Sequence, residues 1–207
     1  MKMGYTFSTK EKLILEATLK VMHKNNFLSA NISETAKHTM LKPEAIKAIY
    51  NSDDALRMAA IFYAASIWVD YIKKDIAGEK DKKTRLRRLL RHYAAGSESY
   101  PASLSLYIDI WKIIRDGQRE NEAFFKEELQ SIYTMFVEAF EELILQEICQ
   151  SFTLTSEIRQ LAWIIVVISD GLHIQNLIEP ESIDFDGVEE VLYKMVESYL
   201  LETGKEV

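Results

Sequence analysis

The chain has 207 residues, of which 48% are hydrophobic, and it carries a net charge of −7. Its single cysteine, Cys149, excludes an intrachain disulfide, and an inert buried thiol is expected there. The first 12 residues lack the apolar core of a signal peptide, and the most apolar run, residues 161–168, is far shorter than the roughly 20 residues that span a bilayer. We therefore expect a cytoplasmic protein without a membrane partner.

The scarcity of helix breakers predicts an all-α fold. Only seven Gly and three Pro occur, whereas Leu, Ile, Glu, Ala and Lys are abundant. No segment alternates apolar and polar residues between turn signals, as a half-buried strand would. In chain order, the apolar periodicity predicts about nine helices.

The charge is unevenly distributed along the chain. Residues 1–56 contain eight Lys and six acidic residues, a net charge of +2, and the remainder contains 17 basic and 26 acidic residues, a net charge of −9. A mildly basic segment beside an acidic body is compatible with a local DNA-binding face, although nucleic-acid-binding domains are often far more basic.

The first predicted helix has clear start and stop signals. Ser8 and Glu11 have the spacing of a capping box, which predicts a helix that begins near Thr9. Asn25 and Asn26 are expected to end this helix through a left-handed cap, because Asn is the best substitute for Gly in that conformation.

Two short helices are predicted next. Asn31 suits the N-cap of a helix over residues 33–38, and Pro43 suits the first position of the following helix. Short helices joined by a tight turn form a helix-turn-helix, whose second helix enters the major groove of DNA. Three small helices of an ordinary bundle would give the same pattern. For a helix-turn-helix, the residues expected to contact DNA are Asn31, Ser33, Lys42, Pro43, Glu44, Ala45, Lys47 and Ala48.

The remainder of the chain reads as a series of longer helices. Ser52 is expected to cap a helix that carries Asp53 and Asp54 in its positive first turn and ends near Gly78. The highly charged residues 79–91 have Leu at helical spacing and are expected to form a helix with a solvated face. Further helices are predicted to begin at Pro101 and to cover about residues 121–149, 155–178 and 186–201.

Residues 13–56 resemble the DNA-binding head of the TetR family of transcriptional regulators. The matching motifs are Ile14-Leu15-Glu16-Ala17, Asn26-Phe27, Asn31-Ile32-Ser33-Glu34-Thr35-Ala36, Thr39-Met40-Leu41-Lys42-Pro43, Ile49-Tyr50 and Asn51-Ser52-Asp53-Asp54-Ala55-Leu56. The resemblance implies a helix-turn-helix head in residues 1–52 and a ligand-binding and dimerisation body in residues 53–207. It also implies a homodimeric, ligand-responsive repressor with a near-palindromic operator and a small apolar or aromatic effector.

Four residues of the head depart from the family pattern. Met40 stands where the family prefers Gly, Lys42 replaces a Ser or Thr cap, Lys47 replaces a Tyr that contacts phosphate, and Asp53 replaces a Lys that contacts phosphate. A left-handed Met40 would cost on the order of 1 kcal/mol, and a carboxylate at position 53 would repel DNA. The alternative is therefore a protein of the same fold that binds a small molecule or lipid and has lost sequence-specific DNA binding.

The resemblance also locates a candidate pocket and a candidate dimer interface in the body. Aromatic residues at helical spacing are more often core than pocket, and both readings stay open for the pocket candidates Tyr63, Trp68, Tyr71, Tyr107, Trp111, Tyr133, Phe136, Trp163, His173 and Gln175. The last two helices resemble the family's four-helix dimer bundle, with Ile164, Ile168, Leu172, Val188, Leu192, Met195 and Tyr199 as candidates.

Catalysis finds little support in the sequence. The chain lacks a Gly-rich phosphate loop, a Gly-x-Ser-x-Gly elbow and a His-Glu-x-x-His motif. Asp170 and His173 share one helical face, which indicates either a ligand-orienting pair or half of a metal site, and a metal would need further ligands that the sequence does not show. We expect no enzyme activity, no metal and no cofactor.

Overall fold

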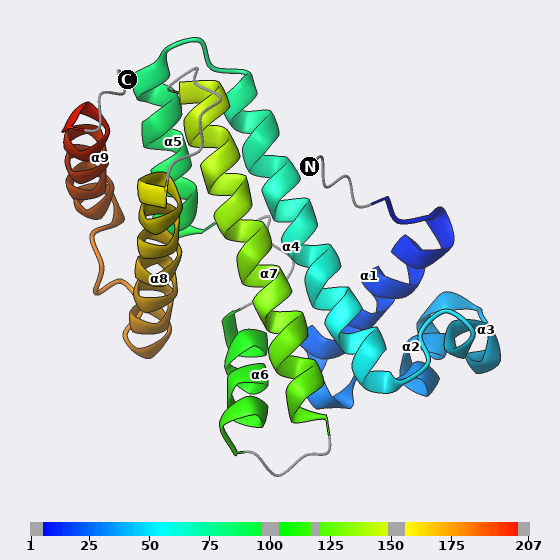
Figure 1. Ribbon diagram of the computed structural model, residues 1–207. Helices are drawn as coiled ribbons and strands as arrows, with labels where there is room; N and C mark the ends of the chain where they lie inside the picture. Colours follow the sequence, from blue (N-terminus) through cyan, green and yellow to red (C-terminus); the bar gives the residue numbers. More distant parts are fainter. Residues whose placement is uncertain (1–5, 97–103, 117–120, 149–155, 203–207) are drawn as a thin grey trace. The chain divides into compact units, whose positions relative to one another are not determined.

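A computed structural model describes residues 6–96, 104–116, 121–148 and 156–202, and these residues form helices and connections without a strand (Figure 1). The expected all-α class is confirmed, as are the nine α-helices within the described residues. The predicted helix start at Pro101 and Cys149 lie outside them. The elements are α1 (Thr9–Lys24), η1 (Phe27–Ser29), α2 (Ile32–Thr39), α3 (Pro43–Lys47), α4 (Asp53–Ala77), α5 (Lys82–Ala95), α6 (Leu104–Asp116), α7 (Glu122–Glu142), η2 (Leu143–Ile148), α8 (Ser156–Ile178) and α9 (Phe185–Glu202).

The chain divides into two compact units. The first comprises Met1–Ile67 and Tyr100–Ile132, and the second comprises Trp68–Ser99 and Tyr133–Val207. Helices α4 and α7 each contribute their first part to the first unit and the remainder to the second. This division reflects compactness rather than role, so the functional boundary between residues 52 and 53 stays a prediction.

The core of the first unit forms where α1 packs against α2. The apolar face of α1, including Ile14, Leu15 and Met22, is buried as its periodicity predicts. The hydroxyl groups of Thr18 and Thr35 lie 3.2 Å apart in this contact, so two buried polar groups on facing helices satisfy each other.

The connection after α1 differs from the prediction. The capping box at Ser8 is present, with the Glu11 amide donating to the Ser8 hydroxyl at 3.2 Å. Neither Asn25 (φ −121°) nor Asn26 (φ −173°) is left-handed, so the predicted cap is wrong. The chain instead enters the short helix η1, and Asn26 caps it by accepting a hydrogen bond from the Ser29 amide at 2.8 Å.

The helix-turn-helix has the predicted start signals and one strained turn residue. The Asn31 side chain caps α2 by accepting from the Glu34 amide at 2.9 Å, and Pro43 is the first residue of α3. Lys42 provides no side-chain cap to α3. Met40 ends α2 in the left-handed region, at φ 57° and ψ 11°, with its side chain fully exposed.

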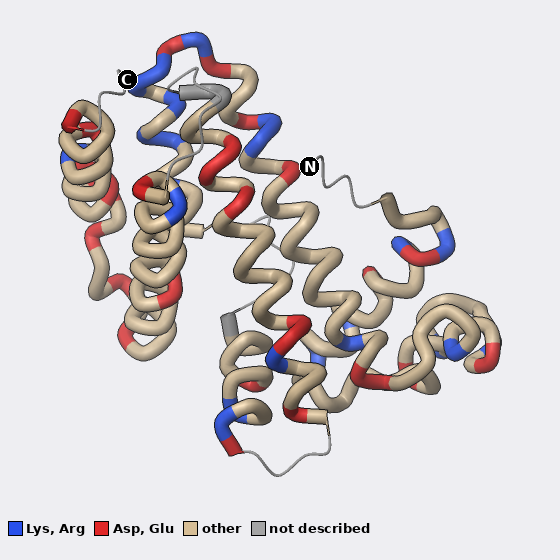
Figure 2. The backbone as a smooth tube through the Cα atoms, viewed as in Figure 1, with Lys and Arg blue, Asp and Glu red and all other residues tan. Residues whose placement is uncertain are grey.

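In the second unit, α5 contacts both α8 and α9. Residues 79–91 were expected to present a solvated face, but the structure pairs that face with acidic residues of α9. Arg87 donates to Glu190 at 2.6 Å and lies 3.9 Å from the ring centroid of Tyr193, and Arg91 lies 2.7 Å from Asp186. Figure 2 shows the basic residues of α5 and the acidic residues of α9.

Two helices are long and apolar enough to pass a length-and-composition test for a membrane span. The apolar part of α4 is 61% buried within the protein, as befits a core helix, whereas that of α8 is only 22% buried. Helix α8 therefore carries an apolar surface that the described residues leave uncovered.

The left-handed residue in the helix-turn-helix gives a stability prediction. Because the exposed Met40 side chain buries no surface, truncating it to Cβ should change the free energy of unfolding little. Removing Cβ as well should relieve the strain of the left-handed backbone. We expect Met40→Gly to be about 1 kcal/mol more stable than Met40→Ala, as measured by urea unfolding of the two variants. An alanine variant as stable as the glycine variant would show that position 40 is not left-handed in solution.

Candidate functional site

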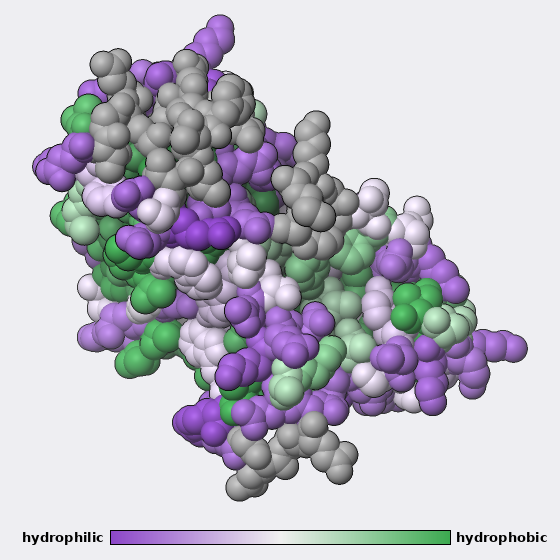
Figure 3. All heavy atoms as spheres, viewed as in Figure 1, coloured by the Kyte–Doolittle hydropathy of each residue, from purple (hydrophilic) through white to green (hydrophobic). Residues whose placement is uncertain are grey.

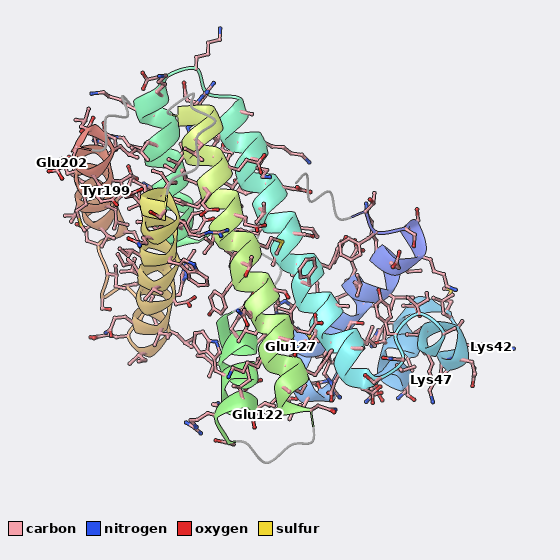
Figure 4. The ribbon with its side chains drawn as sticks, in the orientation of Figure 1. Lys42, Lys47, Glu122, Glu127, Tyr199 and Glu202 are labelled. Atoms are coloured by element: carbon pink, nitrogen blue, oxygen red, sulfur yellow. The ribbon has the colours of Figure 1, made fainter. Side chains whose placement is uncertain are left out.

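The exposed surface of the helix-turn-helix is the first candidate site. Helix α3 is anchored by Ile46, whose side chain is fully buried, and its flanks face outward. Figure 4 shows Lys42 and Lys47 projecting from α3. Of the predicted DNA contacts, the structure places Ser33, Lys42, Pro43, Glu44, Lys47 and Ala48 on the surface and leaves Ala45 half-buried.

Asn31 has a different task from the one predicted. Its carboxamide oxygen accepts from the Glu34 amide at 2.9 Å, and its nitrogen donates to the Ser29 carbonyl at 3.3 Å. Because both ends of the half-buried side chain are engaged, Asn31 holds the start of α2. Its role as a DNA contact stays a prediction.

A buried arginine ties the start of α4 to the segment before α2. Arg57 is only 8% exposed. Its guanidinium donates to the backbone carbonyls of Ala30 and Leu28 and pairs with Asp54. The second carboxylate oxygen of Asp54 accepts from the Asn121 side chain at 2.8 Å. A desolvated guanidinium is costly unless its donors are satisfied, and here two carbonyls and a carboxylate satisfy them.

Asp53 also has a structural partner. Its carboxylate accepts from the Ile32 amide at 2.9 Å, and Ile32 is the first residue of α2. The N–H groups of the first helical turn lack partners within the helix and favour negative charge. Asp53 therefore caps α2 from 21 residues away. Sequence reasoning missed this contact, because no local spacing signals a cap from so distant a residue.

The second candidate site lies in the second unit, where aromatic residues of α4, α5 and α7 pack edge to face. The Trp68 ring lies 5.1 Å from Tyr93 and 5.2 Å from Phe136, and Phe136 lies 6.4 Å from Tyr133. Tyr93 donates to the Phe136 carbonyl at 2.7 Å, and complete burial raises its pKa. This group includes three of the predicted pocket residues, Trp68, Tyr133 and Phe136.

Polar side chains of α8 lie beside this aromatic group. The Tyr133 hydroxyl donates to Asp170 at 2.7 Å. Burial raises the pKa of Asp170 to about 6, and the hydrogen bond from Tyr133 opposes that rise. Burial also lowers the pKa of His173, whose ring is hydrogen-bonded by the backbone of Ala95 and Ser169. Asp170 and His173 thus each have partners of their own, and their role as a ligand-orienting pair stays a prediction.

The other pocket candidates do not join this group. Tyr63, Tyr107 and Trp111 belong to the first unit, where Tyr63 donates to Glu16 at 3.1 Å. Tyr71, Trp163 and Gln175 are exposed in the second unit. Their role in binding a ligand stays a prediction.

The candidate dimer surface consists of exposed apolar residues on α8 and α9. Ile164 and Met195 are exposed as expected, and Val167 and Val191 are exposed beside them. Leu192 is instead buried within the protomer. Ile168, Leu172, Val188 and Tyr199 are half-buried. Figure 3 shows hydrophobic side chains reaching the surface in this part of the unit.

No group of His, Cys, Asp or Glu side chains within the described ranges is arranged to hold a metal ion. The charged clusters of the second unit are ion pairs between helices or within one helix, such as Arg159 with Glu141 at 2.9 Å.

Comparison with solved structures identifies the fold. A Rhodococcus sp. protein assigned to the TetR family of transcriptional regulators has a TM-score of 0.68 at 15% identity, covering 93% of this chain and 99% of that one. A TetR transcription regulator from Haloarcula marismortui has a TM-score of 0.67 at 16% identity, covering 93% and 98%. The chain has the fold of TetR-type transcriptional regulators.

A further structure with the TetR-type fold contains a ligand. The transcriptional regulator FadR from Bacillus subtilis, in complex with stearoyl-CoA, has a TM-score of 0.54 at 14% identity, covering 89% of this chain and 96% of that one. No family sequence model matches the chain, and no curated protein matches it in sequence. All three of these solved structures are of transcriptional regulators.

The Arg57 contacts give a second stability prediction. Arg57→Met keeps the apolar stem and removes the donors to two carbonyls and to Asp54. We expect a loss of about 3 kcal/mol in the free energy of unfolding, because two backbone carbonyls and the half-buried Asp54 carboxylate lose their partner. Urea unfolding followed by circular dichroism measures the change.

Arg88→Met is the matched control, because Arg88 forms ion pairs with Asp75 and Glu79 but is 42% exposed. Exposed ion pairs contribute about 0–1 kcal/mol, so this variant should lose little stability. Equal losses in the two variants would contradict the role assigned to the Arg57 contacts.

Proposed function

We propose that the chain is a homodimeric, DNA-binding transcriptional regulator of the TetR type that acts in the cytoplasm as a ligand-responsive repressor. The observation that carries the proposal is the helix-turn-helix, in which Lys42, just before α3, and Lys47, its last residue, are exposed within a TetR-type fold. Lysines in these positions suit phosphate contacts, and the exposed Glu44 and Ala48 suit contacts with base edges in the major groove.

The environment of Asp53 supports this function over a head that has lost DNA binding. An acidic residue at the start of α4 would repel phosphate if its charge were free. Here the carboxylate accepts from the Ile32 amide and lies at the positive ends of both α2 and α4. The negative charge of Asp53 thus stabilises the helix-turn-helix. An acidic residue at this position is therefore compatible with DNA binding by the head.

Dimerisation follows from the uncovered apolar surface of α8 and α9. A surface of this kind is unfavourable in water and is the mark of an interaction site. A second copy of the chain is the natural occupant, because a two-fold axis would place identical apolar helices against each other. A symmetric dimer reads two half-sites about 34 Å apart or a multiple of that distance, which predicts a near-palindromic operator.

Ligand response would follow from a shift between conformations. An effector that binds more tightly to a conformation with unsuitable spacing of the recognition helices draws the population away from DNA. The stearoyl-CoA complex of the Bacillus subtilis regulator shows that a protein with a similar fold binds a ligand, which supports a ligand site in this chain. The aromatic group around Trp68 and Phe136 is the proposed apolar part of that site.

The first test concerns DNA binding. Binding to duplex DNA from the region upstream of its own gene should be tight, selective and weakened by salt, because phosphate contacts release counterions. Lys42→Ala/Lys47→Ala should bind DNA more weakly. It should also reduce the slope of log affinity against log salt concentration by roughly two to four, since a dimer carries two copies of each lysine. Fluorescence anisotropy at several salt concentrations measures both.

Lys74→Ala/Lys80→Ala is the control of equal charge, because both lysines are exposed and belong to the second unit, outside the helix-turn-helix. It should bind DNA like the wild type. Wild-type protein that shows only generic attraction at low salt, unaffected by the α3 substitutions, would support a ligand-binding protein without an operator.

The second test concerns the dimer. Val167, which is 63% exposed, is replaced by Glu to place a charge in the proposed interface. We expect a shift from dimer to monomer in sedimentation experiments, because an unpaired carboxylate resists burial. Leu13→Glu is the control, since Leu13 is an exposed apolar residue of α1 outside this surface. A wild-type monomer, or a Val167→Glu protein that remains dimeric, would refute this interface.

A further inference from the structure

We propose that Asp170 and the aromatic rings beside it bind the ammonium group of an organic cation. The site comprises the Asp170 carboxylate on α8, the rings of Tyr133 and Phe136 on α7, and Trp68 on α4. That such a cation is the effector rests on the proposed function, whereas its binding by these residues does not.

The first observation is that Asp170 lacks a cationic partner. In the part of the chain that the structure describes, its carboxylate has one hydrogen bond, from the Tyr133 hydroxyl at 2.7 Å, and no ion pair. Other enclosed carboxylates of the same unit are paired: Glu141 with Arg159 at 2.9 Å, and Glu189 with Arg91 at 3.1 Å. An enclosed carboxylate with one neutral donor is costly to the fold, and a bound cation would offset that cost.

The second observation is that the nearest basic side chain on the same helix faces elsewhere. The His173 ring is held by the backbone of Ala95 and Ser169. A Cβ at Gly96 would lie only 2.8 Å from its Nε2 atom, so His173 fills the space left by that glycine. Burial lowers the pKa of His173, which disfavours its charged form. The contacts of the ring are with residues 95, 96 and 169, and Asp170 has its own partner in Tyr133.

The third observation is the aromatic surroundings. Tyr133 contacts Asp170 through its hydroxyl and Phe136 through its ring, at 6.4 Å between centroids, and Phe136 lies 5.2 Å from Trp68. Tyr133 and Phe136 are only half-buried, so part of their surface is open to a ligand. Aromatic faces attract cations, and quaternary ammonium groups are recognised by such rings together with a carboxylate.

These observations select among ligand classes. A metal ion would need more ligands than one carboxylate, and the described residues supply no such group. An anionic head group would be repelled by Asp170, whose pKa of about 6 leaves it ionised near neutral pH. A monovalent organic cation with apolar substituents matches both the charge and the rings.

The test is calorimetric binding to the purified full chain without DNA, with choline, tetraethylammonium and benzyltrimethylammonium as probes. The neutral control is 3,3-dimethylbutan-1-ol, which has the shape of choline without its charge. We expect saturable binding of at least one cation and at least tenfold weaker binding of the neutral alcohol. Because no DNA is present, failure of the proposed DNA binding would leave this measurement unaffected.

Asp170→Asn tests the carboxylate, because it keeps an acceptor for the Tyr133 hydroxyl and removes the charge. We expect it to lose cation binding at least tenfold with an unchanged or raised melting temperature. Asp70→Asn, which removes an exposed carboxylate of α4, should bind like the wild type. Absence of binding by all three cations, equal binding by Asp170→Asn, or a lowered melting temperature with unchanged affinity would overturn the proposal.

Discussion

The burial of one guanidinium group constrains the arrangement of the first unit. Arg57 leaves water only because the carbonyls of Leu28 and Ala30 and the carboxylate of Asp54 satisfy its donors. Those carbonyls lie in η1 and in the residue after it, so their position fixes the point at which α2 begins. A desolvated charge tolerates little displacement of its partners, because each lost contact leaves part of its desolvation energy uncompensated. The orientation of the helix-turn-helix on α4 thus depends on satisfying a single side chain.

The charges of the protein serve different purposes in different places. Asp53 and Asp54 lie at the start of α4, where they cap a neighbouring helix and satisfy Arg57. The arginines of α5 attach α9 through its acidic residues, and among the described residues Val191, Met195 and Leu201 of α9 stay exposed. Asp170, in contrast, has a hydrogen bond from Tyr133 and no ion pair with any of the described residues. A negative total charge of −7 therefore says little about the function of any one acidic residue.

Local signals in the sequence predicted the elements well, and contacts between distant residues escaped them. The caps at Ser8, Asn31 and Ser52 and the helix start at Pro43 follow from spacings of a few residues, and the structure contains all of them. Their chemistry is local, so a short window of sequence suffices. The Asp53 cap joins residues 21 apart, and the pairing of α5 with α9 spans about a hundred. Such contacts depend on how helices pack, which periodicity does not specify. For the same reason, the pocket candidates could be recognised as aromatic but not sorted into groups.

The contacts of Asp53 and Arg57 bear on whether the helix-turn-helix is a separable module. A fragment that ends at residue 52 would contain the recognition helix and every predicted DNA contact. It would lack the carboxylate that caps α2 and the guanidinium that holds the two carbonyls before it. A transplant of this head onto another body must therefore carry at least the first turns of α4 and a partner for Asp54 in place of Asn121. In this protein, the segment proposed to bind DNA and the compact unit that contains it have different boundaries.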